Sequence, residues 1–341
     1  MSIKIISIGS YVAGKVLDNH MLSEMVDTNN QWIVERTGIE TRYIAEDITT
    51  EELAYNSCKN ALDKIDIDIN EVGLLISSTI SNDTVVPSSS FTISGKLGIE
   101  NAVCFDLNAA CSGFIYSLAV AKSFMESTNI KYAILVGAER LSKYVDWKDR
   151  STCILFGDGA GCTILENTCY EKNLNKPDNK VNEEDNISDK KLALELIDSV
   201  LGGKYDQNRY LTISSKLSPK DSDSFIRMNG RQIYKFATEI GVKVIEELLL
   251  KNNIDKKNVC LIIPHQSNQR IIETLAIKSK IEIEKWFVNL EKYGNTSSAS
   301  VPIALDEALE KFDFQSNKGK YIIMLAFGGG LSYGASLLKI N

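Results

Sequence analysis

The chain contains 341 residues, of which 44% are hydrophobic and 24% are charged, and its formal net charge is −7 at pH 7. This length and composition fit one large or two ordinary globular domains and exclude a collagen-like or disordered chain. No apolar run approaches the roughly 18 residues of a membrane-spanning helix, and the acidic balance offers no basic face, so we expect neither membrane insertion nor nucleic-acid binding.

Strand-like apolar runs alternate with helical periods along the chain, which predicts an α/β fold. The N-terminal run MSIKIISIGSYVAG reads as a strand and lacks the apolar block and cleavage site of a secretion signal, so we expect a cytoplasmic protein. Most runs are continuously apolar, as in strands that are covered on both faces. The predicted strands are Ile3–Ile8, Val72–Ile76, Ala102–Leu107, Tyr132–Val136, Cys153–Phe156, Val259–Ile263, Trp286–Asn289 and Tyr321–Ala326.

Two helices carry specific signals. Thr49 and Glu52 have the spacing of a capping box in front of an apolar stripe that begins at Leu53. Further along, the stretch 231–250 places its apolar side chains at helical spacing on one face. We therefore predict helices that start after Thr49 and that span Arg231–Leu250.

Two pairs of segments indicate internal duplication. The runs 102–121 and 286–305 share a layout of strand, small polar residues and a helix rich in Ala and Ser. The runs 153–165 and 322–338 share a strand, a glycine-rich turn and a second strand. Because both pairs occur in the same order, we expect two similar halves, 1–166 and 192–341. The intervening segment 167–191 is rich in Asp, Glu, Lys and Asn, which predicts a solvated insertion loop.

Cysteine and histidine usage limits the possible chemistry. The seven cysteines are odd in number and form no C-x-x-C pair, so we interpret all of them as thiols in a reducing compartment. The only histidines are His20 and His265, which makes a His-rich metal site improbable. We expect no metal.

Cys111 is the first candidate for chemistry. It follows a buried strand (AVCFDL) and a turn of small residues (NAA), and it opens the helix SGFIYSLAVAKSFMES. A thiol at a helix N-terminus meets free backbone N–H groups and the positive end of the helix dipole, which favour the thiolate. The same N–H groups can hold an oxyanion after attack on a thioester.

Three further features fit this chemistry. His265 ends a buried strand and begins the polar loop HQSNQR, where α/β sheets place ligands. Asn295 in YGNTSSAS lies at the site that we equate with Cys111 in the second half, and its amide can donate to a carbonyl that becomes an enolate. The triple glycine 328–330 permits close backbone approach and can supply an N–H to an oxyanion.

Together these features resemble β-ketoacyl-[acyl carrier protein] synthase III, a condensing enzyme of the thiolase superfamily. The similarity covers nearly the whole chain in order, except the insertion 167–191, and implies a homodimer with the thiolase-like five-layer αβαβα fold made of two similar halves. The segments that carry it are NNQWIVERTGIETRYIA (29–45), FDLNAACSGF, DWKDRSTCILFGDGAG (146–161), MNGRQIYKFA (228–237), PHQSNQRI, YGNTSSASVPIAL and LAFGGGLSYGASL.

The resemblance implies a decarboxylative Claisen condensation that initiates fatty-acid synthesis. An acyl-CoA primer acylates Cys111; malonyl-[acyl carrier protein] then loses CO2, and the carbanion attacks the acyl group to give 3-oxoacyl-[acyl carrier protein] and free CoA. His265 and Asn295 would hold the malonyl thioester carbonyl. Backbone N–H groups of Cys111 and Gly329 would form the oxyanion hole for the primer. No cofactor beyond these substrates is implied.

The resemblance also implies binding residues for both substrates. Positions that match CoA contacts in the family are Thr28, Trp32, Arg36, Arg150 and Asn268. Guanidinium groups suit phosphates, and an indole ring can stack on adenine. Positions expected to contact the acidic carrier protein are Gln266, Arg270, Arg231 and Lys235.

Two departures from the family pattern concern specificity. Ser267 stands where the family motif HQAN has alanine, which is a small change. Val86 precedes Pro87 at a position where several relatives carry a bulky Phe that crosses the dimer and closes the acyl pocket. A smaller side chain there predicts a pocket that accepts a primer larger than acetyl.

Other readings remain open beside the initiating synthase. A degradative thiolase needs a second cysteine in the C-terminal glycine turn, and elongating synthases use two histidines, so neither fits. A pathway-specific synthase III-like condensing enzyme or acyltransferase of polyketide or secondary metabolism remains possible. A non-catalytic partner that keeps the fold is the third reading, and the presence of Cys111, His265 and Asn295 argues against it.

Overall fold

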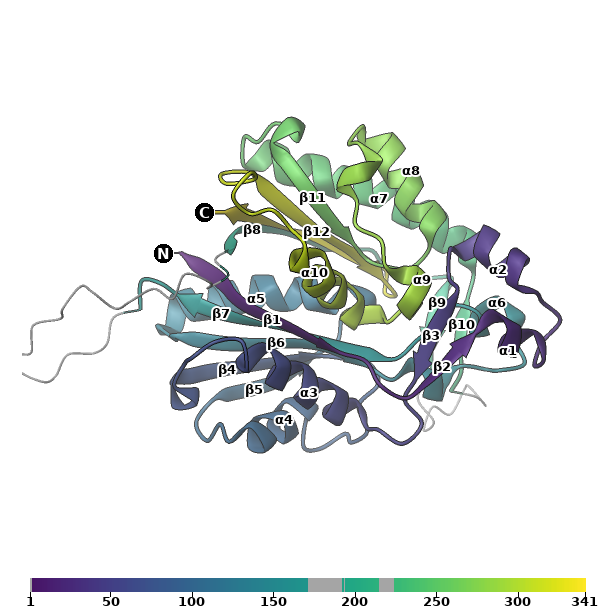
Figure 1. Ribbon diagram of the computed structural model, residues 1–341, viewed down its shortest axis with the longest axis horizontal. Helices are drawn as coiled ribbons and strands as arrows, with labels where there is room; N and C mark the ends of the chain where they lie inside the picture. Colours follow the sequence, from purple (N-terminus) through teal and green to yellow (C-terminus); the bar gives the residue numbers. More distant parts are fainter. Residues whose placement is uncertain (1, 171–191, 193, 215–223) are drawn as a thin grey trace, which may run out of the picture.

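The computed structural model describes residues 2–170, 192, 194–214 and 224–341 (Figure 1). A nine-stranded mixed sheet organises these residues, which confirms the predicted α/β class. From one edge to the other, its strands are β11 (Val259–Pro264), β12 (Tyr321–Gly328), β13 (Ser332–Ile340), β8 (Leu194–Gly203), β1 (Ile3–Tyr11), β7 (Gly159–Asn167), β6 (Tyr132–Glu139), β4 (Val72–Ser78) and β5 (Val103–Leu107).

The sheet consists of two similar sets of strands that meet between β1 and β8. These two strands pair at Lys4↔Glu195 and Ile5↔Leu194, near their first residues. In one set, β4 pairs in parallel with β6, which pairs antiparallel with β7. In the other, β11 pairs in parallel with β12, which pairs antiparallel with β13. The two sets therefore repeat one strand order.

Helices form three layers around the two sets of strands (Figure 1). The central helices are α5 (Gly113–Thr128), which contacts β4 and β6 as well as β8 and β13, and α10 (Ser300–Glu310), which contacts β1 and β7 as well as β11 and β12. The outer helices of the first set are α3 (Thr50–Leu62) and α4 (Ser89–Leu97), and those of the second are α7 (Gly230–Lys251) and α8 (Gln269–Ser279). This is the five-layer αβαβα arrangement that the resemblance implied.

Burial explains why α5 occupies the centre. Its sequence is apolar nearly all round, so no face is suited to water. Phe114, Ile115, Leu118 and Met125 are completely buried. Burying a side chain of this size contributes about 1.5–3 kcal/mol, so the packing of α5 against strands of both halves stabilises their association.

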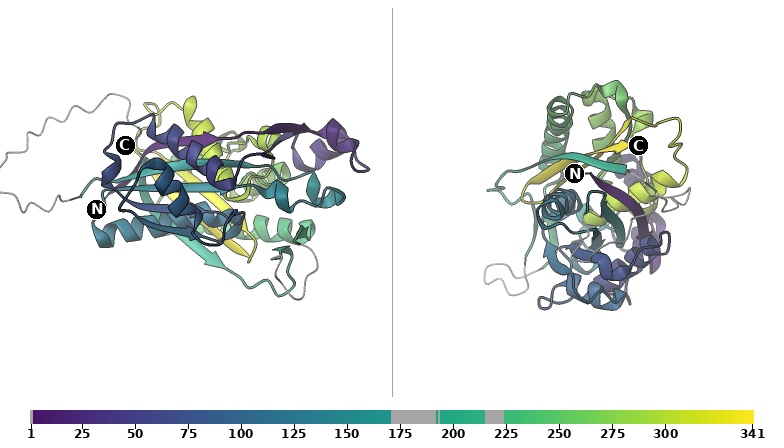
Figure 2. Two further views of the ribbon diagram at one scale, coloured as in Figure 1. Left: turned by 90° about the horizontal axis from the view of Figure 1, so that it is seen from below. Right: turned by 90° about the vertical axis from the view of Figure 1, so that its left-hand side faces the viewer.

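Shorter elements gather at one end of the molecule, opposite the chain termini (Figure 2). Two small sheets lie there, one made of β2 and β3 and the other of β9 and β10. The elements at this end are β2 (Lys15–Asp18), α1 (Asn19–Ser23), α2 (Asn30–Thr37), β3 (Thr41–Ile44), α6 (Arg150–Cys153), β9 (Leu211–Ile213), β10 (Ile226–Met228) and α9 (Leu290–Tyr293).

The strand predicted at 153–156 is wrong. The helix α6 ends at Cys153, and the next strand, β7, begins only at Gly159. Asp149 starts the helical turn by accepting the Ser151 N–H at 2.9 Å. The buried Arg42 guanidinium then binds the Ile154 carbonyl oxygen at 2.6 Å, so this carbonyl is not available to a neighbouring strand.

The strand predicted at 286–289 is also wrong, although its position in the fold is correct. Trp286 forms a single parallel bridge with Ile262 on β11. This position corresponds to that of β5 in the other half, where β5 pairs in parallel with β4. The Gln266 side chain forms hydrogen bonds with the backbone after Trp286. Its Nε2 donates to the Phe287 carbonyl oxygen at 3.1 Å, and its Oε1 accepts the Asn289 N–H at 3.0 Å. Hydrogen bonds to a side chain therefore take the place of strand pairing at 287–289.

The other predicted strands are present, most of them longer than expected, and both predicted helices are confirmed as α3 and α7. All seven cysteines are free thiols. None of the described helices is long and apolar enough to cross a membrane. Of the predicted insertion, residues 171–191 lie outside the described residues, and β7 and β8 flank it on either side.

The capping box of α3 provides a stability prediction. Thr49 Oγ1 accepts the Glu52 N–H at 3.1 Å, and the Glu52 carboxylate accepts the Thr49 N–H at 2.9 Å. Loss of such a cap typically costs about 1 kcal/mol. We expect Thr49→Ala to lower the free energy of unfolding by about this amount in urea titrations, while Thr49→Ser remains within a few tenths of wild type. Equal losses in both variants would contradict the role of the hydroxyl.

Candidate active site

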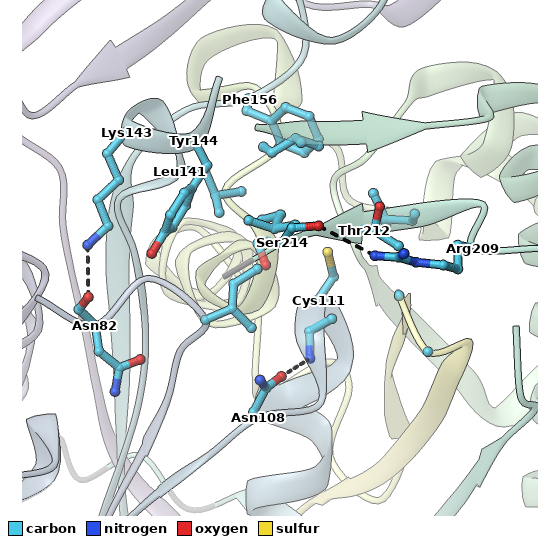
Figure 3. A pocket seen from close by; sticks show the side chains of 18 of the residues that line it. Asn82, Asn108, Cys111, Leu141, Lys143, Tyr144, Phe156, Arg209, Thr212 and Ser214 are labelled. Atoms are coloured by element: carbon cyan, nitrogen blue, oxygen red, sulfur yellow. Dashed lines mark hydrogen bonds between the residues drawn. The ribbon is translucent and has the colours of Figure 1, made fainter. Parts of the chain in front are cut away.

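Cys111 lies in the 3-10 turn η2 (Ala110–Ser112), between β5 and α5. Ala110 holds a left-handed backbone conformation, with φ of 48°. This turn directs the Cys111 sulfur into a cavity of about 770 Å³. In Figure 3 the sulfur points between Leu141 and Tyr144 on one side and Thr212 on the other. A non-glycine residue at positive φ is uncommon and often marks a functional site.

The protonation state of Cys111 differs from the prediction. We expected the helix N-terminus to favour the thiolate, but burial raises the pKa of the thiol to about 12. The Ser297 side chain, a hydrogen-bond partner of the sulfur, opposes this rise, and the charge of Glu139 adds to it. Loss of hydration therefore outweighs the hydrogen bonds that favour the charged form of the Cys111 sulfur.

Backbone from the C-terminal half approaches the amide of Cys111 closely. A Cβ built on Gly328 would lie 2.7 Å from the Cys111 nitrogen and 3.3 Å from the Ser112 nitrogen, which excludes any side chain at this position. The next residue, Gly329, lines the same cavity as Cys111. The glycine turn and η2 are therefore adjacent, as an oxyanion hole shared between them requires.

His265 directly follows β11 and is 2% exposed. Its backbone N–H donates to the Leu325 carbonyl oxygen at 2.7 Å, and its ring meets Phe327 edge to face at 5.6 Å between centroids. Burial lowers the pKa of the imidazole to about 3. His265 is therefore neutral at physiological pH and carries a proton on one nitrogen.

The hydroxyl of Ser300, the first residue of α10, contacts one of these two nitrogens. Ser300 Oγ lies 2.6 Å from His265 Nδ1 and also lies 3.3 Å from the Gln266 N–H, which can only donate. The hydroxyl can accept from this N–H and direct its own proton to Nδ1. The His265 proton then resides on Nε2, where it can be donated to a ligand.

Asn295 is held in a comparable way. Its backbone N–H donates to the Leu155 carbonyl oxygen at 2.8 Å, and its carbonyl oxygen accepts the Gly157 N–H at 3.1 Å. Its side-chain Oδ1 accepts the Ser297 N–H at 2.9 Å. This contact fixes the orientation of the amide and leaves the Nδ2 donors for a ligand.

The duplication places Asn295 differently from our expectation. The turn η6 (Ser297–Ala299) precedes α10 as η2 precedes α5, and Ser297 has φ of 51°, like Ala110. By this correspondence Cys111 is equivalent to Ser298, and Asn295 is equivalent to Asn108, whose Oδ1 accepts the Ala110 N–H at 3.3 Å. The expected equivalence of Asn295 with Cys111 is therefore wrong by three positions.

Two cavities meet at Cys111. Beside the cavity of about 770 Å³ lies a second cavity of about 230 Å³. Cys111, Phe156 and Leu211 line both cavities and therefore lie between them. His265 and Asn295 line the second cavity together with Cys111. The structure thus brings the three predicted catalytic residues to one place, with a separate space on either side of the thiol.

The outer end of the second cavity carries several predicted CoA contacts. Arg36 and Asn268 line it. The guanidinium groups of Arg36 and Arg150 lie over the Trp32 ring, at 4.6 and 4.8 Å from its centroid. Thr28 lies in the segment before α2, and its Oγ1 is buried without a hydrogen-bond partner. The structure thus places Trp32, Arg36, Arg150 and Asn268 around α2 and the second cavity. Thr28 lies just before α2 in the chain.

The residues predicted to contact a carrier protein divide into two groups. Arg231 and Lys235 lie one turn apart on the exposed face of α7, and Arg270 is exposed on α8 with its Nε donating to the Glu35 carbonyl oxygen at 2.9 Å. Gln266 is 2% exposed, and its amide is used by the backbone at 287–289. It cannot reach a docked protein, and its role is structural.

Val86 is 84% exposed and lines neither cavity at Cys111. Its predicted place in the acyl pocket therefore requires a second subunit. Among the described residues, no group of three or more His, Cys, Asp or Glu side chains is arranged to hold a metal ion.

Sequence reasoning missed the residues that support the three central side chains. Ser297 and Ser300 belong to the run TSSAS, which directly follows Asn295. This concentration of hydroxyl side chains was the sequence feature that could have indicated their role. Glu139, completely buried at the end of β6, accepts the hydroxyls of Ser297 and Ser298 at 3.0 and 2.8 Å. Its sequence context, VGAERL, offered no comparable signal.

A buried thiol at the N-terminus of a central helix, in one cavity with a neutral His and an Asn, is the arrangement expected of a condensing enzyme with the thiolase fold. The family models for 3-Oxoacyl-[acyl-carrier-protein (ACP)] synthase III match residues 105–178, and those for its C-terminal part match residues 249–340. A beta-ketoacyl-[acyl-carrier-protein] synthase III from Clostridium beijerinckii is 42% identical over 341 residues, covering 99% of each chain. The chain belongs to the β-ketoacyl-[acyl carrier protein] synthase III family.

Solved structures agree with this assignment. The 3-oxoacyl-[acyl-carrier-protein] synthase III of Aquifex aeolicus superimposes with a TM-score of 0.85, 37% identity and coverage of 99% of both chains. The priming β-ketosynthase of the R1128 polyketide pathway superimposes with a TM-score of 0.84 and 28% identity, covering 99% of this chain and 96% of that one. The predicted thiolase-like fold is confirmed.

The contact between Ser300 and His265 leads to a testable prediction. Ser300→Ala removes the donor that holds the proton on Nε2, and loss of one buried hydrogen bond of about 1–1.5 kcal/mol corresponds to roughly tenfold in rate. We expect CO2 release from malonyl-carrier protein to fall about tenfold in single-turnover assays. Acylation of Cys111 should be unchanged in the same variant. An equal loss in both half-reactions would show that Ser300 does not act through His265.

Proposed function

We propose that Cys111 accepts the acyl group of an acyl-CoA primer, and that His265 and Asn295 then direct the decarboxylation of malonyl-[acyl carrier protein], so that the chain initiates fatty-acid synthesis. The observation that carries this proposal is the position of Cys111 between two cavities, one of which also contains His265 and Asn295. The acyl chain can therefore occupy one space while the second substrate enters the other.

In the first half-reaction, the Cys111 sulfur attacks the primer thioester and CoA leaves. The oxyanion that develops on the acyl carbonyl is stabilised by backbone N–H groups of η2 and the glycine turn, where Gly328 permits close approach. Formation of an acyl-enzyme divides one difficult transfer into two easier steps.

In the second half-reaction, the malonyl thioester carbonyl accepts hydrogen bonds from His265 Nε2 and Asn295 Nδ2. Loss of CO2 leaves an electron pair that is delocalised onto this carbonyl oxygen as an enolate, and two neutral donors stabilise it without a base. The lowered pKa of His265 fits this role, because the imidazole must donate in its neutral form. The carbanion then attacks the acyl-Cys111 carbonyl, and the sulfur leaves.

The residues around α2 suit the CoA end of the primer. Arg36 and Arg150 provide two cations for phosphate groups, and Trp32 provides a flat ring for adenine. In the described structure the two guanidinium groups cover the Trp32 ring.

The carrier protein is expected to dock where the second cavity opens. Tyr234 and Ile233 line this cavity, and Arg231 and Lys235 flank them on α7. Neither cation forms an ion pair with a described residue, so both remain available to an acidic partner. Arg270 on α8 extends the same basic surface.

A homodimer accounts for the apolar surface at the other edge of the sheet. Val103 on the edge strand β5 is 45% exposed, Phe91 on α4 is 56% exposed, and Val85 and Val86 are largely exposed. An unpaired edge strand beside apolar side chains favours association with a second copy. In such a dimer Val86 can enter the partner's acyl cavity, where its small size leaves room for a primer larger than acetyl.

The second candidate function is a pathway-specific condensation in polyketide or secondary metabolism. The priming polyketide synthase shares 28% identity with the chain, whereas the synthase III proteins of Aquifex aeolicus and Clostridium beijerinckii share 37% and 42%. The initiating reaction is therefore the better supported of the two.

Cys111→Ala tests the proposed nucleophile directly. We expect wild-type protein to gain one acyl group when it is incubated with a panel of acyl-CoAs and analysed by intact-protein mass spectrometry. Cys111→Ala should gain none, and Cys153→Ala, which changes another buried thiol, should behave as wild type. Labelling by acetyl or short branched groups supports the initiating synthase, labelling by unusual acyl groups alone supports the pathway-specific enzyme, and no labelling contradicts both.

Charge reversal on α7 tests carrier-protein docking. We expect Arg231→Glu combined with Lys235→Glu to raise the KM for malonyl-carrier protein at least tenfold, with little change in kcat, because rim charges act mainly on association. The effect should shrink in high salt. Lys243→Glu, which alters an exposed cation further along the same helix, is the matched control. Equal effects in both variants would contradict the proposed surface.

A further inference from the structure

Ser267 carries a buried hydroxyl that no part of the mechanism above uses. Its Oγ is enclosed and forms no hydrogen bond with the described residues. A hydroxyl that is buried without a hydrogen bond destabilises a protein, and an alanine at the same place would avoid that penalty. An unpartnered buried group in a native protein therefore needs an explanation, and a ligand that supplies the missing partner is one.

Ser267 lies between the two ends of the second cavity. It belongs to the turn between β11 and α8, and it lines this cavity. In the chain it stands between His265, which is buried beside Cys111, and Asn268, whose Nδ2 donates to the Arg36 carbonyl oxygen at 3.0 Å. Because Arg36 is exposed, the contact with Asn268 marks the outer end of the cavity. Ser267 thus lies along the route from this outer end to the sulfur.

The backbone on both sides of Ser267 is fixed. The Ser267 N–H donates to the His265 carbonyl oxygen at 2.9 Å, and Asn268 Oδ1 accepts the Arg270 N–H at 2.9 Å at the start of α8. The turn therefore holds the Ser267 side chain beside the cavity, and rotation about its Cα–Cβ bond alone redirects the hydroxyl. This rotation breaks no hydrogen bond to a described residue.

The other hydroxyl side chains that line the second cavity already have partners. Each lies close to a second group of the protein: Thr37 at 2.7 Å, Ser151 at 2.6 Å and Tyr234 at 2.7 Å. The Asn268 amide is also occupied, with Oδ1 bonded to α8 and Nδ2 bonded to the end of α2. Among the described side chains between the outer end of the cavity and the catalytic residues, the Ser267 hydroxyl is therefore the group with a hydrogen bond left to form.

The walls of the second cavity indicate what this partner is. They include the apolar side chains Leu155, Met228, Ile233 and Phe236. Both proposed substrates carry their thioester at the end of a pantetheine arm, which is a narrow chain interrupted by amide groups. An amide that enters an apolar cavity needs a hydrogen-bond partner, and a hydroxyl can either donate to it or accept from it. The amide and the Ser267 hydroxyl each lack a partner until they meet.

We propose that the Ser267 hydroxyl forms a hydrogen bond with an amide of the pantetheine arm when an acyl-CoA or a carrier-protein thioester occupies the second cavity. This proposal rests on the proposed function, because it takes the second cavity as the route to Cys111. Since both substrates share the arm, Ser267 is a binding residue in both half-reactions. It does not select the primer, whose acyl group occupies the other cavity.

Three thioesters of decreasing length locate the contact. Acetyl-CoA contains the arm with its phosphates and adenine, acetyl-pantetheine contains the arm alone, and S-ethyl thioacetate lacks both. Second-order rate constants for acylation of wild type and Ser267→Ala are measured by rapid quench and intact-protein mass spectrometry. We expect Ser267→Ala to lower the constant about three- to tenfold with acetyl-CoA and with acetyl-pantetheine, as for one lost hydrogen bond, and to leave that of S-ethyl thioacetate within about twofold.

Each other pattern of losses overturns the proposal. An equal loss with all three thioesters would show that the hydroxyl acts on the reacting centre or on the fold. A loss that is confined to acetyl-CoA would place the contact at the phosphates or the adenine. No loss with any of the three would show that the hydroxyl does not bind the substrate.

The second substrate gives an independent measurement. Ser267→Ala should raise the KM for malonyl-carrier protein by the same factor, with kcat within about twofold, because a contact that is equal in the ground and transition states leaves kcat unchanged. The matched control is Ser151→Ala, which removes a hydroxyl of the same cavity lining that is bonded to Asp149. It should remain within about twofold of wild type in both assays. An equal loss in the control, or an unchanged KM in Ser267→Ala, would contradict the proposal.

Stability separates a ligand contact from a structural one. Without ligand, Ser267→Ala should unfold at the same or a higher urea concentration than wild type, because it loses an unpartnered buried hydroxyl. N-ethyl pantothenamide, which is the arm without its sulfur, should raise the unfolding midpoint of wild type more than that of the variant. A lower midpoint in the unliganded variant would show that the hydroxyl stabilises the fold, and the proposal would then be wrong.

Failure of the proposed function would be recognised separately. If none of the thioesters acylates wild type, the proposed function fails, and the contact is then tested by binding alone. Cys111 is alkylated by iodoacetamide with and without N-ethyl pantothenamide. Weaker protection in Ser267→Ala than in wild type supports the contact, whereas equal or absent protection overturns it.

Discussion

The site depends on one constraint: two central helices, one from each half of the chain, must begin at nearly the same point. Each begins with a 3-10 turn whose first residue has positive φ, Ala110 in one half and Ser297 in the other. Neither residue is glycine, so each turn costs conformational energy that the surrounding packing must supply. The packing of α5 and α10 against strands of both halves provides it, and the result is a buried junction with Cys111 at its centre.

Burial at this junction sets the proton chemistry of the site. Removal from water disfavours the charged form of every group, so it raises the pKa of Cys111 to about 12 and lowers that of His265 to about 3. For His265 the shift is useful, because a neutral imidazole can donate to an enolate. For Cys111 the same shift is an obstacle, because the nucleophile must lose its proton as it attacks.

The sequence allowed the fold and the central residues to be predicted, because their signals are local. Buried strands, the capping box at Thr49 and the motifs around Cys111, His265 and Asn295 each lie within a few adjacent residues. The failures have non-local causes. The segment 153–156 is apolar enough for a strand, but the side chain of Arg42, more than a hundred residues away, binds its backbone. Likewise Gln266 replaces the ladder at 286–289 through contacts that no window of sequence contains.

The supporting residues of the site were missed for the same reason. A serine in a helix-initiating run is ordinary by itself, and Ser300 gains meaning only because its hydroxyl lies 2.6 Å from His265 Nδ1. Glu139 is unremarkable in VGAERL until the fold encloses it among hydroxyls. The direction of the Cys111 pKa shift also depends on burial, which is its largest cause and which the sequence around Cys111 did not reveal.

The duplication explains how one fold position acquires different chemistry in each half. The two helices present Cys111 in the first half and Ser298 at the equivalent place in the second, so the first provides the nucleophile and the second a structural hydroxyl. The residue after β4 is Thr79, whereas the residue after the equivalent strand β11 is His265. Each half thus contributes what the other lacks: the proposed nucleophile from one, and the proposed donors to the enolate from the other. Because these groups converge only when both halves pack on α5 and α10, the stability of that central layer and the competence of the site are the same requirement.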